Sequence, residues 1–77
     1  MTYDEAKTKI LPQSIYKHFK GNYYKVLAIA KHSETSEPIV IYQDIEKYGI
    51  TWARPAYMWF DEVAPNVKRF ERIMKGE

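Results

Sequence analysis

The chain has 77 residues and a mass of 9.2 kDa, which suits one small domain and excludes two catalytic domains. Hydrophobic residues make up 45% of it, aromatic residues 16% and charged residues 29%, a composition typical of a folded globular domain. The absence of cysteine excludes disulfides, thiolate metal sites and thiol nucleophiles. Because so small a domain buries only about 60% of the surface of its unfolded chain, we expect any binding site to be shallow or shared between subunits.

The net charge of +2 is too small to imply nucleic-acid binding by itself. The charge is unevenly distributed, since residues 16–32 carry four lysines and no acid, whereas residues 33–62 carry six acids and two bases. No apolar stretch approaches the ~20 residues that span a bilayer, and the N-terminal residues lack the pattern of a signal peptide. The sequence therefore predicts no membrane segment and a cytoplasmic location.

Residues 1–13 are predicted to form a short helical extension. Thr2 and Glu5 have the spacing of a capping box, and apolar residues follow at helical intervals. Pro12 should end the helix, because proline pushes the preceding residue out of helical geometry. A helix of two or three turns is marginal in water, so we expect it to dock on the domain or on a neighbouring subunit.

Residues 14–77 are predicted to form one β domain, because short segments rich in branched and aromatic residues alternate with turn residues. Pro55 should begin a helical turn whose aromatic residues plug an open barrel end. These signals favour a mainly β fold, a small SH3-like barrel of about five strands. The predicted strands are residues 15–19, 23–32, 39–43, 50–54 and 67–73.

The longest predicted strand, residues 23–32, carries apolar residues on both faces, which predicts a central, bent strand. Strict alternation assigns its residues to two faces. One face carries Tyr24, Val26, Ala28, Ala30 and His32, and the other carries Tyr23, Lys25, Leu27, Ile29 and Lys31.

Several ordered motifs resemble the signature of a family of short bacterial domains of unknown function. These are KHFKGNYYKVL at 17–27, HSET at 32–35, EPIVIYQ at 37–43, WARP at 52–55 and MWF at 58–60. The resemblance covers roughly residues 14–73 and implies a compact SH3-like β-barrel without an established activity.

His32, Ser33 and Glu34 supply the residue types of a base, a nucleophile and an orienting carboxylate. Consecutive residues of an extended segment point to opposite faces, however, so they cannot form a local triad. We expect a loop whose polar side chains cap backbone donors, and we keep a small hydrolase using His32 and Glu34 as a further alternative. Two histidines without cysteine do not predict a metal site, and scattered glycines exclude a phosphate loop. No cofactor is predicted.

The leading interpretation is a non-enzymatic binding module for a peptide or a small polar ligand. Arg54 lies at the end of a predicted strand between Trp52 and Pro55. One possibility is a structural ion pair between Arg54 and Glu34 or Glu37. The other is a recognition groove in which Arg54 grips a carboxylate or phosphate while Trp52 and Tyr42 provide a flat wall. The predicted binding residues are His32, Ser33, Glu34, Glu37, Tyr42, Trp52 and Arg54.

The alternative is binding of single-stranded RNA or DNA. Small barrels stack bases on aromatic side chains while cations follow the phosphates, and the first strands interleave aromatic residues with lysines. Tyrosines in strands also pack in cores, and exposed lysines discourage aggregation of strand edges. The residues of this alternative are Lys17, Lys20, Tyr23 and Lys25. A homo-oligomer formed through the N-terminal helix or a barrel edge is also possible.

Overall fold

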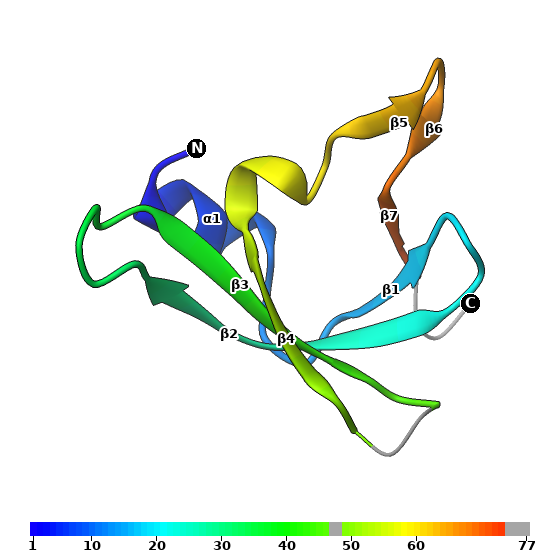
Figure 1. Ribbon diagram of the computed structural model, residues 1–77, viewed down its shortest axis with the longest axis horizontal. Coiled ribbons are helices and arrows are strands. Elements are labelled where there is room, and N and C mark those ends of the chain that lie inside the picture. Colours follow the sequence, from blue (N-terminus) through cyan, green and yellow to red (C-terminus); the bar gives the residue numbers. More distant parts are fainter. Residues whose placement is uncertain (47–48, 74–77) are drawn as a thin grey trace.

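The computed structural model describes residues 1–46 and 49–73, and these form a mainly β domain (Figure 1). The predicted fold class is therefore confirmed. Residues 74–77 of the predicted β domain lie outside the described residues. The elements are α1 (Tyr3–Lys9), β1 (Ile15–His18), β2 (Tyr23–Lys31), β3 (Pro38–Asp44), β4 (Thr51–Pro55), the 3-10 turn η1 (Ala56–Met58), β5 (Glu62–Ala64), β6 (Val67–Lys68) and β7 (Phe70–Arg72).

Five strands form one antiparallel sheet in the order β4-β3-β2-β1-β7, and β5 and β6 form a separate hairpin. Within the described residues no strand pairs with the outer edge of β4 or β7, so the sheet is strongly bent but not closed. No helix in this part of the chain is long and apolar enough to cross a bilayer.

The predicted last strand, residues 67–73, is divided between the two sheets. Arg69 is the point of division. Its backbone N–H donates to the carbonyl of Asp61 at 2.9 Å, on the hairpin side, and its own carbonyl accepts from the N–H of Phe19 at 2.9 Å, beside the main sheet. These bonds satisfy the backbone of Arg69 on both sides of the break and tie the hairpin to the sheet.

The N-terminal helix forms as the capping box predicts. The hydroxyl of Thr2 accepts from the N–H of Glu5 at 3.1 Å, and the carboxylate of Glu5 accepts from the N–H of Thr2 at 2.8 Å. Ala6 and Ile10 are fully buried in the core. The helix therefore docks on its own domain, where burial of its apolar side compensates for its short length.

A β-bulge in β2 changes which residues face the core. Val26 pairs with Tyr42, but Ala28 pairs with Ile41, so Leu27 is the extra residue. The alternation reverses there: Val26 is buried, Ala28 is exposed, and Ile29 packs against the core. The predicted strict alternation is therefore wrong beyond Leu27. The bulge lets β2 bend, as a strand shared by both halves of a curved sheet must.

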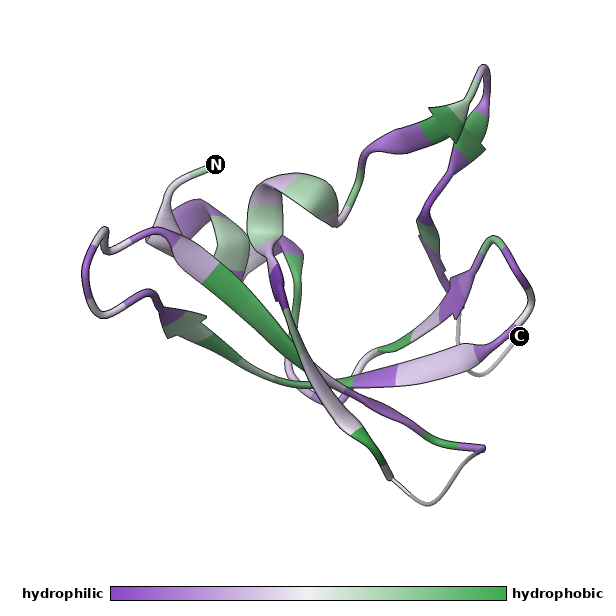
Figure 2. Cartoon of the chain, in the orientation of Figure 1, coloured by the Kyte–Doolittle hydropathy of each residue, from purple (hydrophilic) through white to green (hydrophobic). Residues whose placement is uncertain are grey.

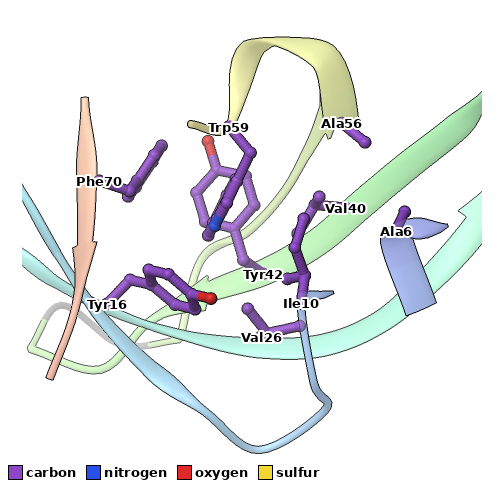
Figure 3. Packing of buried hydrophobic residues seen from close by; sticks show 9 residues of the cluster. All are labelled: Ala6, Ile10, Tyr16, Val26, Val40, Tyr42, Ala56, Trp59 and Phe70. Atoms are coloured by element: carbon purple, nitrogen blue, oxygen red, sulfur yellow. The ribbon is translucent and has the colours of Figure 1, made fainter. Parts of the chain in front are cut away.

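The core is an aromatic cluster on the concave side of the sheet (Figure 3). The rings of Trp59 and Phe70 stack with centroids 3.9 Å apart and planes at 8°. Tyr16 and Tyr42 contact Trp59 edge-on, with centroid distances of 5.2 Å and 4.9 Å. The turn after β4 thus fills the open side, as predicted, while Tyr57 stays 66% exposed. Figure 2 shows hydrophilic residues in the hairpin between β2 and β3, away from this core.

Replacing Trp59 with alanine should remove most of the stability of the domain. Loss of a buried aromatic side chain costs about 3–5 kcal/mol, and domains of this size have only about 0.05–0.15 kcal/mol per residue. Urea denaturation followed by circular dichroism measures the effect. Tyr57→Ala is the matched control and should change the free energy of unfolding by less than about 0.5 kcal/mol. Equal midpoints for Trp59→Ala and the wild type would contradict the assigned core.

Candidate functional site

Arg54 spans the open side of the sheet. It pairs with buried Val40, so its side chain lies on the concave face. The Nε–H of Arg54 donates to the hydroxyl of Tyr42 at 3.3 Å, and the guanidinium carbon lies 5.7 Å from the centre of the Phe70 ring. Arg54 belongs to β4 and Phe70 to β7. The side chain therefore connects the two strands whose outer edges are unpaired.

Within the described residues Arg54 has no carboxylate partner. The ion pair in this part of the chain joins Arg69 to Asp61, with N–O distances of 2.9 Å and 3.1 Å. The ion pair considered between Arg54 and Glu34 or Glu37 is not formed. A guanidinium has five N–H donors, and only the Nε–H of Arg54 meets an acceptor among residues 1–46 and 49–73. The donors on both Nη atoms meet no acceptor in that part of the chain.

Protonation of His18 is disfavoured, in part by the positive charge of Arg54. Burial lowers the pKa of His18, and the charges of Arg54, Arg69 and Lys20 lower it further. The Nδ1 of His18 accepts from the backbone N–H of Lys20 at 3.2 Å, which leaves the proton of the neutral ring on Nε2. Burial and the three nearby positive charges therefore favour the neutral form of His18.

Two tyrosines complete the surroundings of Arg54. The rings of Tyr24 and Tyr42 meet edge-on with centroids 5.3 Å apart. Burial raises the pKa of the Tyr24 hydroxyl, and the negative charge of Asp44 raises it further. The Tyr24 hydroxyl therefore stays protonated at neutral pH, where it can donate as well as accept. We refer to His18, Tyr24, Tyr42, Arg54 and Phe70 as the Arg54 cluster.

The structure brings three of the predicted binding residues, Tyr42, Trp52 and Arg54, to the concave face. Trp52 pairs with Tyr42 and is 48% exposed, whereas Tyr42 is only 5% exposed. Tyr42 is therefore a core residue that contributes its hydroxyl, and Trp52 provides the exposed aromatic surface. No described cavity includes Arg54, so the surface is shallow, as the small size of the domain predicts.

The predicted loop residues lie elsewhere. The pairing of Ile39 with Pro55 places the hairpin 32–37 near the end of β4, away from Trp52. The Nδ1 of His32 accepts from the N–H groups of Glu34 and Thr35 at 3.1 Å and 3.4 Å. His32 thus caps the turn, as expected of a structural loop. Residues His32, Ser33, Glu34 and Glu37 are all exposed.

No catalytic relay is assembled in this hairpin. Within the described residues no hydrogen bond connects the imidazole of His32 to the hydroxyl of Ser33 or to the carboxylate of Glu34. The residues that the structure describes also contain no group of three or more histidine and acidic side chains placed to hold a metal ion.

Three of the four residues of the nucleic-acid alternative, Lys17, Tyr23 and Lys25, lie on the opposite, convex face of the sheet. Lys17 pairs with Tyr23, and the ammonium of Lys17 lies 5.9 Å from the centre of the Tyr23 ring. Lys25 follows on the same face of β2. Lys20 lies in the turn between β1 and β2, and Glu71 sits opposite Lys17 and offsets part of its charge.

Sequence reasoning missed a cavity beside the connection between α1 and β1. It has a volume of about 560 Å³ and lies between the α1–β1 connection, β2 and the end of β7. Its lining comes from three segments that are distant in sequence, so no local motif identifies it. In the sequence, Pro12 and Gln13 indicate only the end of the helix. The backbone of Gln13 has a positive φ of 74°, and no glycine at this position marks that conformation in the sequence. The lining residues are Leu11, Pro12, Gln13, Ser14, Ile15, Lys25, Arg72 and Ile73.

The fold and these surfaces define a class: a small, mainly β domain with a bent antiparallel sheet and a half-buried arginine at its open side. Residues 14–74 match the family described as protein of unknown function DUF1653, and the chain belongs to this family. The match covers the resemblance found in residues 14–73. No curated protein and no solved structure matches the chain.

Replacing Arg54 with glutamine should raise the pKa of His18, because one of the charges that oppose its protonation is removed. NMR titration of the His18 ring measures this directly. Lys9→Gln, on the exposed side of α1, removes the same charge elsewhere and should leave the titration of His18 unchanged. An unchanged pKa in Arg54→Gln would contradict the placement of the guanidinium.

The same lowered pKa predicts a pH dependence of stability. The unfolded chain binds a proton at His18 more readily than the folded one, so stability is complete above the ordinary pKa of 6.5 and falls as the pH drops below it. His18→Gln should flatten this slope in denaturant titrations between about pH 7.5 and 5.5.

Proposed function

We propose that this domain is a non-enzymatic binding module in which Arg54 binds an anionic group of a peptide or small polar ligand. The observation that carries the proposal is a half-buried guanidinium held in place without a carboxylate partner in residues 1–46 and 49–73. Charged side chains are rarely buried unless they are paired. Among the described residues Arg54 has a hydrogen bond and an aromatic contact but no ion pair, and Asp61, whose pKa its charge helps to lower, is paired with Arg69. An external anion would give Arg54 a direct partner.

The geometry suits a carboxylate or a phosphate. Arginine binds these groups through two parallel N–H···O bonds. The contact between Nε of Arg54 and Tyr42 fixes the plane of the guanidinium while the two Nη groups stay available. Because the side chain is already ordered by Tyr42 and Phe70, binding costs less conformational entropy than it would at a mobile arginine.

Nearby groups support the same ligand class. Arg54, Arg69 and Lys20 act together on His18. Asp61, whose pKa is lowered by Arg69 and to a smaller extent by Arg54, is already bound to Arg69. Exposed Trp52 beside the Arg54 cluster offers an aromatic surface for an apolar or planar part of the ligand.

Acetylated, amidated heptapeptides with a central Glu, phosphoserine or Gln test the proposal. The Glu and phosphoserine peptides should shift the NMR resonances of the Arg54 Nε–H and of His18, and the Gln peptide should bind at least about tenfold more weakly. Arg54→Gln should lose this discrimination. Lys9→Gln, which removes one positive charge from the exposed side of α1, is the control. Equal binding of all three peptides, or unchanged binding by Arg54→Gln, would show that Arg54 only connects β4 to β7.

Binding of single-stranded nucleic acid is the second candidate, favoured by the Lys17–Tyr23 pair and by Lys25 on the convex face. A base stacked on Tyr23 with phosphates near the lysines would use this arrangement.

The expected signature is an affinity for oligo(dT) that falls steeply with salt. Each lysine that contacts a phosphate of single-stranded DNA contributes about 0.7 to the slope of log K against log salt, so Lys25→Gln should reduce the slope by about that amount. Lys9→Gln on α1 is the control. Fluorescence anisotropy at several salt concentrations measures both, and salt-independent binding or none at low salt would exclude this candidate.

A further inference from the structure

We infer that the cavity beside the α1–β1 connection is a second binding site, and that it takes a monocarboxylate with an aliphatic chain. This site is distinct from the Arg54 cluster, because the two share no residue. Its volume of about 560 Å³ lies within the range of about 300–1,000 Å³ found for ligand pockets. The other described cavity, beside His18, is smaller at about 220 Å³.

The apolar part of the lining favours a hydrocarbon chain. Leu11, Pro12, Ile15 and Ile73 contribute to the wall, and Leu11 and Ile73 remain 44% and 38% exposed. Covering such surface favours a complex, because apolar area is removed from water. The chain of a bound ligand would provide that cover.

The charged part of the lining favours an anion. Lys25 and Arg72 both line the cavity, and none of its lining residues is acidic. Among the residues that the structure describes, neither cation has a carboxylate partner. Lys25 pairs with Ile15, and Arg72 pairs with buried Tyr16, so the two side chains leave opposite faces of the sheet at this edge. A carboxylate in the cavity would accept from either cation. An aliphatic carboxylate therefore matches both halves of the lining.

The wall of the cavity is held in place by the backbone. The N–H of Gln13 donates to the carbonyl of Val26 at 2.8 Å, and the N–H of Val26 donates to the carbonyl of Ser14 at 2.9 Å. The N–H of Ile73 donates to the carbonyl of Ile15 at 2.8 Å. These bonds join the three segments of the lining. Because the segments are ordered before a ligand arrives, binding does not have to order them.

The backbone conformation of Gln13 also helps to shape this connection. Its φ of 74° is in the left-handed region, which non-glycine residues adopt at a cost of order 1 kcal/mol or more. The hydrogen bond from Gln13 to Val26 holds this conformation and so shapes the wall between Pro12 and Ser14.

NMR titration with sodium octanoate, with octanamide as the neutral comparison, tests the inference. Octanoate should give saturable shifts at Ser14, Ile15 and Lys25, and octanamide should bind at least about tenfold more weakly because it lacks the charge. Lys25→Gln or Arg72→Gln, whichever removes the cation that holds the carboxylate, should weaken octanoate binding by about tenfold. Both substitutions remove charge without removing a buried side chain, so the dispersion of the spectrum should stay that of the folded protein.

Two controls separate this site from its neighbours. Lys17→Gln removes a lysine of the same convex face that does not line the cavity, and it should leave octanoate binding unchanged. Arg54→Gln should also leave it unchanged, so failure of the peptide test at Arg54 and failure of the octanoate test are independent results.

A second ligand distinguishes the source of the carboxylate. An acetylated tripeptide ending in leucine with a free carboxyl group presents the same chemistry from a polypeptide end, and its amide is the control. Tighter binding of the tripeptide than of octanoate assigns the site to peptide C-termini, and the reverse assigns it to free aliphatic acids. Equal binding of octanoate and octanamide, shifts that do not saturate, or unchanged binding by both Lys25→Gln and Arg72→Gln would overturn the inference.

Discussion

The stack of Trp59 on Phe70 is the contact on which the arrangement of this domain depends. It joins the turn after β4 to β7, so it packs together two segments that no described backbone ladder connects. Tyr16 and Tyr42 meet the Trp59 ring edge-on from the sheet beneath. Without this stack the concave face would be open to water, and Arg54 would lose the ring against which its guanidinium lies. Core and candidate site therefore share two residues, Tyr42 and Phe70.

This sharing explains why the recognition surface is shallow. A 77-residue chain has few aromatic residues to spare once its core is filled, and Tyr42 shows the compromise, because its ring is buried while its hydroxyl fixes Arg54. The cavity beside Gln13 arises differently, since the α1–β1 connection passes over the sheet there without filling the space beneath it. The surface around Arg54 is thus formed by core residues, and the cavity beside Gln13 is formed by the α1–β1 connection.

The sequence predicted those features that rest on neighbouring residues. The capping box of Thr2 and Glu5 is local, and so is the cap that His32 provides for its hairpin. The extra residue in β2 at Leu27 could not be predicted, because strict alternation and the bulge both leave apolar residues on each face. The partners of Arg54 could not be predicted either, since Tyr42 and Phe70 reach it only through the sheet order. The cavity depends on three separate segments and was invisible for the same reason.

The main sheet has an odd number of strands, which limits how its two outer edges can pair. Every neighbour in the order β4-β3-β2-β1-β7 is antiparallel, so the two outer strands, separated by four reversals, run in the same direction. An odd number of strands cannot close into a ring that is antiparallel throughout. Closure would need one parallel pair between β4 and β7, and within the described residues these strands meet instead through the side chains of Arg54 and Phe70.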